Sequence, residues 1–231
     1  MKDAMLEELR MTDNQKAYDG LYNRYIKRVL GFCIALPFFV AALPLYAIIS
    51  TAIIMEDGLP VFYRPIRGGY KGKNFRIFKF RTMVRNADQI GGGTTALHDP
   101  RITKVGRFLR KTKLDETANL INIVLGTMCF VGPRPELLQY TNKYEGVEKE
   151  ILEVRPGVTD YSSIEFINLD EIVGAENADE MYEKKVLKQK NALRVKYAET
   201  VSLKTDFDLI FTTLWKVREK AFGYIVKREH R

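Results

Sequence analysis

One long apolar run dominates the pattern of hydrophobic and polar positions near the start of the chain. From Val29 to Met55 no residue is charged, and a run of about 27 residues is long enough to cross a bilayer as a helix. Pro37 and Pro44 lie inside it, and a proline within a helix removes a hydrogen bond and kinks the helix. Basic residues flank both sides, whereas a simple span is expected to be basic on one side. The pattern therefore favours a helix that enters the membrane, breaks near Pro44 and returns to the same face.

The segments around this run are predicted to carry shorter elements. Residues 1–26 are polar and mildly helical, and they lack the apolar core of a cleavable signal peptide. Residues 75–81 alternate apolar and basic side chains, which predicts a half-buried strand with a cationic face. Amphipathic helices are expected over residues 178–200 and 205–220. The second contains Trp215 and could lie in the membrane interface, although packing on the core is the more common use of such a face.

Residues 113–135 form the stretch around which the rest of the chain is organised. Thr112 lies three residues before Asp115, the spacing of a capping box at a helix start. The following apolar residues recur at helical spacing, and Gly126 marks a stop. We therefore expect a helix with Asp115 and Glu116 in its first turn. Its buried face is expected to comprise Leu114, Ala118, Ile121 and Leu125, and the stiff turn Gly132-Pro133-Arg134-Pro135 follows it.

An acid pair in the first turn of a helix has two explanations. The helix macrodipole favours acidic residues there by about 0.3–1 kcal/mol each. Alternatively, the helix N-terminus keeps one carboxylate ionised as a nucleophile or a metal ligand, while nearby arginines hold an anion. Spacing alone favours the first explanation, so the decision depends on the rest of the chain.

Composition narrows the class of partner. The chain has 231 residues, of which 46% are hydrophobic and 29% charged, and these values are typical of a globular protein. Its net charge of +8 implies an anionic partner such as nucleic acid, a membrane surface or a phosphorylated substrate. One of the two cysteines lies inside the apolar run, which argues against a disulfide framework. Neither histidine has a neighbour at metal-ligand spacing, so no zinc site is visible.

Two short motifs carry little weight. The glycine loop from Gln89 to Thr95 lacks the Gly-Lys-Ser/Thr ending of a phosphate-binding P-loop, so we assign it no nucleotide role. Asp206-Phe207-Asp208 matches the metal-binding Asp-x-Asp of nucleotide-sugar transferases. A pattern of three residues inside a helix is weak support for a metal site.

Four segments, in this order, carry a resemblance to one family. The segments are KRVLGFCIALPFFVAALP, FRIFKFRTM, DPRITKVGRFLRKTKLDETANLINIVLGTMCFVGPRPE and VRPGVT. On these segments the chain is similar to the bacterial monotopic polyprenyl-phosphate phosphoglycosyl transferases, also called bacterial sugar transferases. The resemblance covers residues 27–160 and continues more weakly to residue 215. Its most specific part is the block from LDE to VGPRP.

The resemblance implies a reaction. Such enzymes move a sugar 1-phosphate from a UDP-sugar to undecaprenyl phosphate on the cytoplasmic face of the bacterial inner membrane, and they release UMP. The aspartate of an Asp-Glu pair attacks the sugar-bearing phosphorus, and the lipid phosphate then attacks the covalent phosphosugar-enzyme. A magnesium ion bridges the donor diphosphate beside the pair. Here Asp115 and Glu116 would be the catalytic residues and the Mg²⁺ ligands, a role that suits carboxylates.

The resemblance also implies roles for other residues. Lys79 matches a functional lysine of the family, Arg134 a phosphate-binding arginine, and Arg110 a basic position near the site. Arg155, in a second arginine-bearing turn, is a further candidate for binding substrate phosphate. Pro44 matches the proline that breaks the re-entrant membrane helix.

The chain departs from the family pattern in three places. Leu43 stands where many members have a serine before the helix-breaking proline, and Gly31 stands in place of an acid. After the second arginine turn, residues 160–168 lack the Gly-Trp-Ala-Gln-Val-Asn-Gly-Arg ending of many members. The sequence therefore leaves open which group replaces that arginine and which sugar is accepted.

We expect a mixed α/β, helix-rich fold with three parts. Residues 1–26 form a polar helical segment, residues 27–56 a re-entrant helix-break-helix, and residues 57–231 a cytoplasmic catalytic domain with amphipathic interfacial helices. We read this chain as the minimal catalytic unit for starting a surface glycan. The expected partners are a UDP-sugar, undecaprenyl phosphate and the phospholipid membrane, not nucleic acid, and a homodimer is compatible with the sequence. Two alternatives stay open: a membrane-anchored glycosyltransferase that releases UDP, and a non-enzymatic protein that binds anionic membranes.

Overall fold

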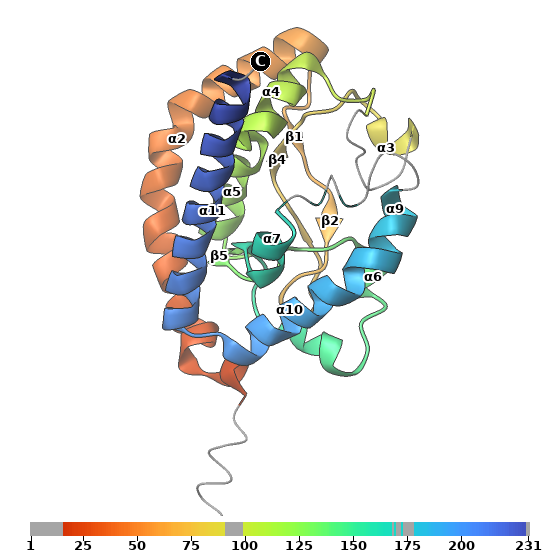
Figure 1. Ribbon diagram of the computed structural model, residues 1–231. Coiled ribbons are helices and arrows are strands. Elements are labelled where there is room, and N and C mark those ends of the chain that lie inside the picture. Colours follow the sequence, from red (N-terminus) through yellow and green to blue (C-terminus); the bar gives the residue numbers. More distant parts are fainter. Residues whose placement is uncertain (1–15, 91–98, 168, 170–171, 173–177, 230–231) are drawn as a thin grey trace, which may run out of the picture.

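Two long helices run along one side of a body of short helices and small sheets in the view of Figure 1. The computed structural model describes residues 16–90, 99–167, 169, 172 and 178–229. The long helices are α2 (Lys27–Asp57) and α11 (Leu203–Glu229), and the predicted mixed, helix-rich fold is confirmed. The other elements, with η marking 3₁₀ and π helices, are η1 (Ala17–Asp19), η2 (Tyr22–Ile26), β1 (Phe62–Tyr63), β2 (Ile66–Arg67), η3 (Tyr70–Gly72), β3 (Phe75–Arg76), β4 (Lys79–Phe80), α3 (Ala87–Ile90), α4 (Lys104–Thr112), η4 (Leu114–Ala118), α5 (Asn119–Val124), β5 (Cys129–Val131), α6 (Leu138–Thr141), η5 (Gly146–Glu153), β6 (Gly157–Thr159), α7 (Tyr161–Glu165), α9 (Ala178–Met181), η6 (Tyr182–Leu187) and α10 (Lys188–Thr200).

Two predicted segments fall partly outside the described residues. Of the polar segment over residues 1–26, residues 1–15 lie outside them, and η1 and η2 occupy most of the remainder. Most of the glycine loop from Gln89 to Thr95 also lies outside them. The predictions for those positions therefore stay predictions.

Helix α2 continues through both of its prolines. It is 31 residues long, with Pro37 and Pro44 in its interior, and Figure 1 shows it bending toward its C-terminal end. The break predicted at Pro44 is therefore wrong. A proline removes one backbone hydrogen bond, which bends a helix without ending it when the flanking turns stay helical. A Cβ added at Gly31 would lie 3.5 Å from Cγ2 of Ile123, so the small residue lets α2 approach α5 closely.

The two sides of α2 differ in their surroundings. A stripe at helical spacing is buried against the body, and the opposite side is apolar and exposed: Phe38 is 64% and Ile48 68% accessible. Among the described residues, Tyr22–Asp57 is the one helical stretch whose length and composition would let it cross a membrane. The buried apolar stripe comprises Gly31, Ala35, Tyr46, Ile49 and Ile53.

The strand predicted over residues 75–81 is divided between two small antiparallel sheets. β3 pairs with β2 and β4 pairs with β1. Between them, the buried side chain of Asn122 accepts a hydrogen bond from the Phe78 amide at 2.7 Å and donates one to the Arg76 carbonyl at 2.9 Å. The Asn122 side-chain amide takes the place of a strand partner. It attaches the segment that contains Lys79 to helix α5. A third, parallel pair joins β5 to β6.

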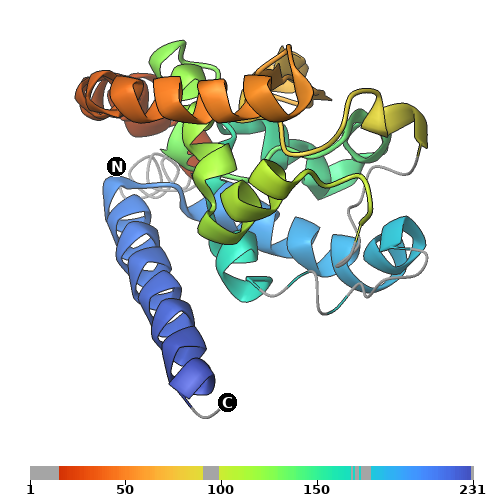
Figure 2. The same ribbon diagram turned by 90° about the horizontal axis from the view of Figure 1, so that it is seen from above.

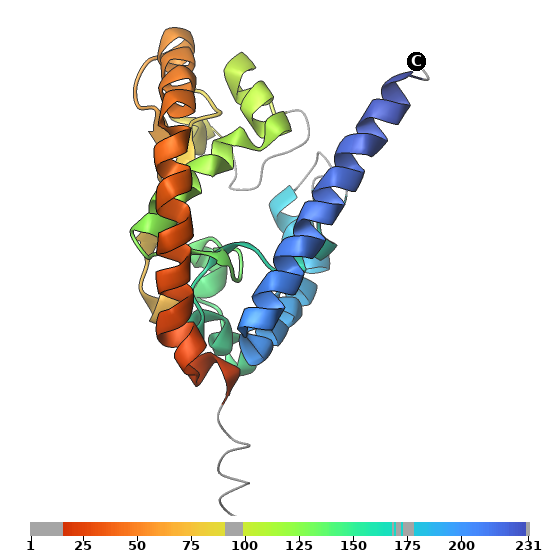
Figure 3. The same cartoon turned by 90° about the vertical axis from the view of Figure 1, so that its left-hand side faces the viewer.

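Helix α11 packs on the body only along one side. Leu209 is buried in a core cluster with Val131, Val154 and Tyr197, whereas Phe211 and Trp215 are 67% and 60% exposed. Figures 2 and 3 show the C-terminal part of α11 standing apart from the other helices and forming a V with α2. Packing on the core, the expected use of this apolar face, is therefore wrong for its most exposed residues. The helix passes the edge of the body, which covers only its first turns.

Candidate active site

The acid pair lies just after one helix ends and another begins. Thr112 is the last residue of α4, and its hydroxyl donates to the Phe108 carbonyl at 2.9 Å. Lys113 then takes the left-handed conformation, with φ of 60°, and Asp115 and Glu116 stand in the first turn of η4. The capping box predicted at Thr112 is wrong, because its hydroxyl bonds back to its own helix. The predicted position of the acid pair in a first helical turn is confirmed.

The buried face of η4 and α5 is more polar than the sequence predicts. Ala118 is buried as expected, but Leu125 is 59% exposed. Asp115, Asn119 and Asn122 occupy the buried positions instead. The change from 3₁₀ to α geometry within this segment shifts which residues face inward, so the apolar spacing alone points to the wrong face.

Helix α2 holds both sides of the acid pair. The Tyr46 hydroxyl donates to the Thr117 carbonyl of η4 at 2.6 Å. The Glu56 carboxylate accepts hydrogen bonds from the amides of Lys104 and Val105, at 2.7 and 2.8 Å, and so caps the start of α4. The long apolar helix and the acid pair are therefore parts of one framework.

Glu116 is fixed by two cations. Lys79 Nζ lies 3.0 Å from Glu116 Oε1, and Arg134 binds the carboxylate through both of its terminal nitrogens, with Nη1 at 3.0 Å from Oε2. Burial alone would raise the pKa of Glu116, but the charges of Arg134 and Lys79 outweigh it and hold the pKa well below its usual value. Glu116 is therefore ionised over the working range of pH. The structure brings these three predicted site residues together.

Asp115 has a different environment although it is the next residue. Its side chain is only 8% exposed, and its Oδ1 atom is enclosed without a hydrogen-bond donor. Burial raises the pKa of Asp115, and the charge of Glu116 raises it further, while Lys79, Lys113 and Arg110 oppose the shift. An enclosed carboxylate oxygen without a partner is costly, and it is suited to bonding with a substrate or an ion.

A cavity of about 220 Å³ lies beside this cluster. Lys79 and Arg134 form part of its wall, together with Arg67, Asn119 and Lys190. Apolar and aromatic side chains complete the lining, an arrangement typical of small-molecule sites. The other lining residues are Ile77, Met128, Pro135, Glu136, Leu137, Tyr140, Gly157, Leu169 and Tyr182.

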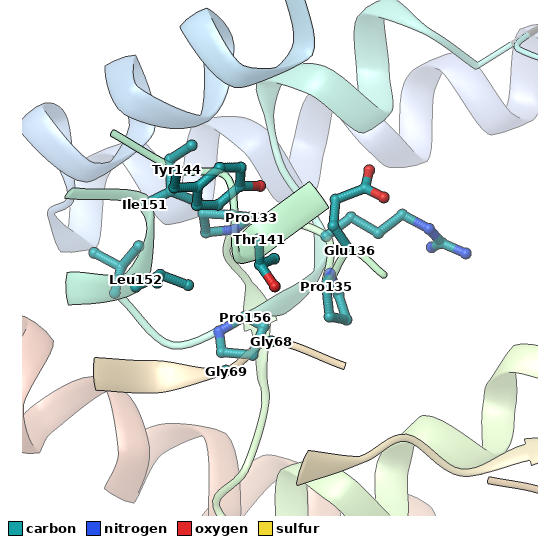
Figure 4. A pocket seen from close by; sticks show the side chains of 12 residues that line it. Gly68, Gly69, Pro133, Pro135, Glu136, Thr141, Tyr144, Ile151, Leu152 and Pro156 are labelled. Atoms are coloured by element: carbon teal, nitrogen blue, oxygen red, sulfur yellow. The ribbon is translucent and has the colours of Figure 1, made fainter. Parts of the chain in front are cut away.

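A second cavity next to it is too small for a substrate. It measures about 10 Å³, which is about the space of one water molecule. Figure 4 shows Tyr144, Ile151 and Leu152 on one side of it and Glu136 on the other. A Cβ added at Gly68 would lie 2.7 Å from Thr141, so a glycine is needed for the chain segments to meet here.

Glu136 anchors the far wall of the larger cavity. Its carboxylate receives hydrogen bonds from Tyr182 and Arg194, and Lys190 Nζ lies 3.9 Å away. Burial would raise the pKa of Glu136, but Arg194 and Lys190 lower it to about 2. Burial lowers the pKa of Lys190 to about 8, with Arg194 acting in the same direction. This group is a closed network that holds α10 against the turn following Arg134.

The other predicted site residues lie in different surroundings. Arg110 donates from Nε to the Thr82 hydroxyl at 2.9 Å, and its charge reaches Asp115. Arg155 is not brought to the Glu116 cluster: its Nη1 donates to the Asn23 carbonyl at 3.1 Å, and its guanidinium covers the Tyr70 ring at 4.5 Å. These contacts favour a structural role for Arg155, and its part in phosphate binding stays a prediction. Pro44 lies within α2 and is exposed.

Sequence reasoning missed Arg67, Asn119, Lys190 and Glu136. Arg67 belongs to a basic turn in which no single arginine stands out, and Lys190 lies in a basic helix. Glu136 directly follows the Gly-Pro-Arg-Pro turn, and its acidic charge next to an arginine was the available signal. Only the folded chain shows that these residues share one cavity.

Comparison with known proteins shows what the chain is similar to. A model of the family described as bacterial sugar transferase matches residues 22–220. A Sinorhizobium fredii protein named exopolysaccharide production protein ExoY is 32% identical over 203 residues, which are 81% of this chain and 83% of that protein. A Caulobacter vibrioides UDP-glucose:undecaprenyl-phosphate glucose-1-phosphate transferase is 31% identical over 191 residues, covering 81% of this chain and 68% of the relative.

Some relatives are much longer than the matched region. An Escherichia coli protein with the same name as the Caulobacter transferase is 32% identical over 198 residues, which are 84% of this chain but 40% of the relative. The chain therefore spans about two fifths of the length of that relative.

Proposed function

The chain belongs to the bacterial sugar transferase family, and from this premise we propose that it transfers a sugar 1-phosphate from a UDP-sugar to undecaprenyl phosphate. The products are UMP and a polyprenyl-diphosphate-linked sugar. One observation carries the proposal: Asp115 is enclosed and unpartnered beside a Glu116 that two cations hold at the wall of a cavity. The names of the relatives supply the substrate class.

The reaction takes two displacements at one phosphorus. An ionised Asp115 oxygen attacks the sugar-bearing phosphorus, and the bond from that phosphorus to the bridging oxygen breaks, so that UMP leaves with the electron pair. A phosphate oxygen of undecaprenyl phosphate then attacks the same phosphorus and releases the Asp115 carboxylate. Splitting the transfer in this way is the usual advantage of covalent catalysis.

Glu116 acts on the phosphate-binding groups. Its carboxylate stays ionised and sets the positions of Lys79 Nζ and the Arg134 guanidinium. Both cations also line the cavity, where they would contact donor phosphate oxygens as charge moves toward the leaving group. Arg110 adds positive charge near Asp115.

The acid pair fits a magnesium ion. Mg²⁺ is usually bound by one or two carboxylates together with substrate phosphates and water. The enclosed Oδ1 atom of Asp115 is an available oxygen ligand. Glu116, whose oxygens bond Lys79 and Arg134, would serve as a second ligand only when these cations turn to the donor phosphates. Within the described parts of the chain no group of three or more His, Cys, Asp and Glu side chains gathers, which agrees with a site that the diphosphate completes. The ion would neutralise part of the diphosphate charge.

Two exposed apolar faces support a membrane arrangement. We propose that α2 enters the cytoplasmic leaflet of the inner membrane, bends near Pro44 and returns to the same face as a re-entrant element. The exposed side of α11, with Phe207, Phe211 and Trp215, would lie in the interface as an amphipathic helix. Basic flanks suit an anionic cytoplasmic surface. The undecaprenyl phosphate would then reach the site from the lipid side.

The test is product identity. Full-length protein purified in detergent or nanodiscs is incubated with undecaprenyl phosphate, Mg²⁺ and a panel of UDP-sugars, beside the Asp115→Asn variant. We expect UMP from one donor or a few, and none from the variant. UDP in place of UMP would show a glycosyltransferase instead. The donor that reacts also names the sugar.

A further inference from the structure

Arg67 stands out among the cationic side chains that line the cavity. It is half-buried at the end of β2. Its guanidinium forms no hydrogen bond and no ion pair with any residue that the structure describes, so its positive charge is left for a ligand in the cavity. The three other cationic residues in the wall, each within 4 Å of a carboxylate, are Lys79, Arg134 and Lys190.

The backbone fixes where the Arg67 side chain begins. Arg67 pairs with Phe75 in the β2–β3 ladder, and the amide of the next residue, Gly68, donates to the Glu136 carbonyl at 3.3 Å. Burial lowers the pKa of Arg67, and Arg134 acts in the same direction, although Glu136 opposes them. A guanidinium stays protonated under these conditions. It is therefore a partly desolvated charge, which an anion would relieve.

Arg67 and Lys79 have different neighbours in the cavity wall. Lys79 lies 3.0 Å from the Glu116 carboxylate, whereas the amide of the residue after Arg67 is bonded to the Glu136 carbonyl. Arg134 binds Glu116 and lies two residues before Glu136, so it stands between the two surroundings. A donor whose reacting phosphorus lies at Asp115 would extend past Arg134 toward Arg67.

We propose that Arg67 binds the phosphate that remains with the nucleoside of the donor. This assignment rests on the proposed function and names one further contact of the same site. The planar fork of a guanidinium matches two phosphate oxygens. When the bond between the attacked phosphorus and the bridging oxygen breaks, the electron pair stays on the nucleoside monophosphate. Arg67 holds the anion on which this charge collects.

Binding of UMP tests the assignment without the chemical step. Calorimetric titration of the full chain in detergent compares wild type with Arg67→Gln, Arg67→Lys and a matched control, Arg76→Gln. Arg76 lies on the neighbouring strand and its side chain is exposed. We expect UMP binding to weaken about 10- to 100-fold in Arg67→Gln, because a charged hydrogen bond is lost, and less in Arg67→Lys. The control should bind as wild type does.

Wild-type UMP affinity in Arg67→Gln would overturn the assignment. If the KM for the UDP-sugar rose in the same variant, Arg67 would act at the sugar end of the donor instead. Circular dichroism and thermal unfolding of all three variants show whether a loss of UMP affinity comes from misfolding. The proposed function is judged separately by the product-release assay, so a protein that released UDP would refute that function while the titration still decided the role of Arg67.

Discussion

Asp115 and Asp206 are both buried aspartates in the first turn of a helix, yet the protein surrounds them in opposite ways. The Asp206 carboxylate accepts hydrogen bonds from Tyr22 and Tyr197, each at 2.6 Å, and lies 3.0 Å from Lys27 Nζ. Asp115 keeps one enclosed oxygen without any donor. The Asp206 group joins η2, α2, α10 and α11, whereas Asp115 precedes Glu116, whose partners Lys79 and Arg134 line a cavity.

The difference separates a carboxylate that holds the fold from one that is left available. A buried charge with every oxygen bonded stabilises one arrangement of its helices. A buried charge with an empty oxygen destabilises the free protein and is retained where a ligand completes it. Sequence spacing ranks these two aspartates wrongly if it is used alone, since Asp206 belongs to an Asp-x-Asp pattern and Asp115 to an ordinary helix start.

The largest effect that the comparison predicts is on catalysis at Asp115. Asp115→Asn keeps the shape of the side chain and removes the proposed nucleophile, so UMP release should fall by at least about 1,000-fold. Because the pKa of Asp115 is raised in the folded protein, ionising it at neutral pH costs stability. The variant should therefore unfold at the same temperature as wild type or a higher one. Activity above one per cent of wild type would show that another group forms the covalent intermediate.

The second prediction concerns the group around Asp206, which we call the closed group: Asp206, Lys27, Tyr22 and Tyr197. Asp206→Asn leaves Lys27 buried without a counter-charge and should lower the free energy of unfolding by about 3–5 kcal/mol. Denaturant or thermal unfolding in detergent measures the change. In the double variant Lys27→Met/Asp206→Leu no charge is left unpaired, so part of the loss should be recovered. A single variant as stable as wild type would mean that water or the tyrosines replace the ion pair.

The sequence predicted the pieces of the site better than their arrangement. The long apolar helix, the acid pair in a first turn, and Lys79 and Arg134 were all identified from pattern or family resemblance. The prediction of a helix cap at Thr112 was wrong because a local pattern cannot show that a hydroxyl bonds back to its own helix.

Long-range contacts account for the other differences. The prediction of a helix break at Pro44 was wrong because packing along one side of α2 keeps the turns around the proline helical. Arg67 was not predicted as a site residue, because its position in the cavity wall depends on a strand pairing and on chain segments that are distant in the sequence. A single sequence does not display such contacts.

The pH dependence sharpens the same contrast. Attack needs an ionised Asp115, and its pKa is raised by burial and by Glu116, so the rate should fall about tenfold per pH unit below that pKa. The acid limb of the pH–rate profile should therefore lie at a higher pH than the usual pKa of an aspartate. In the closed group, burial raises the pKa of the Tyr22 and Tyr197 hydroxyls further from neutrality, so these donors stay protonated throughout.

The measurement is the burst of UMP released when no lipid acceptor is present. It isolates the pH dependence of the first step, because undecaprenyl phosphate, whose second phosphate ionisation would also titrate, is absent. Glu116→Gln removes a negative charge beside Asp115 and frees Lys79 and Arg134 to act on it, and both changes should move the acid limb to lower pH. A limb at the same pH in this variant would show that a group other than Asp115 titrates.

The smallest expected effect is at Asp208, and it decides against the rival transferase. Asp208 is exposed on α11, and its partner in the Asp-x-Asp pattern, Asp206, is occupied by Lys27, Tyr22 and Tyr197. The two carboxylates therefore cannot bind a metal together without breaking the closed group. Asp208→Asn should leave UMP formation and its Mg²⁺ dependence within about twofold of wild type, as expected for an isolated surface substitution. A tenfold loss, or a raised Mg²⁺ requirement, would move the metal site from the acid pair to α11, and with it the reaction from phosphosugar transfer toward transfer of the sugar alone.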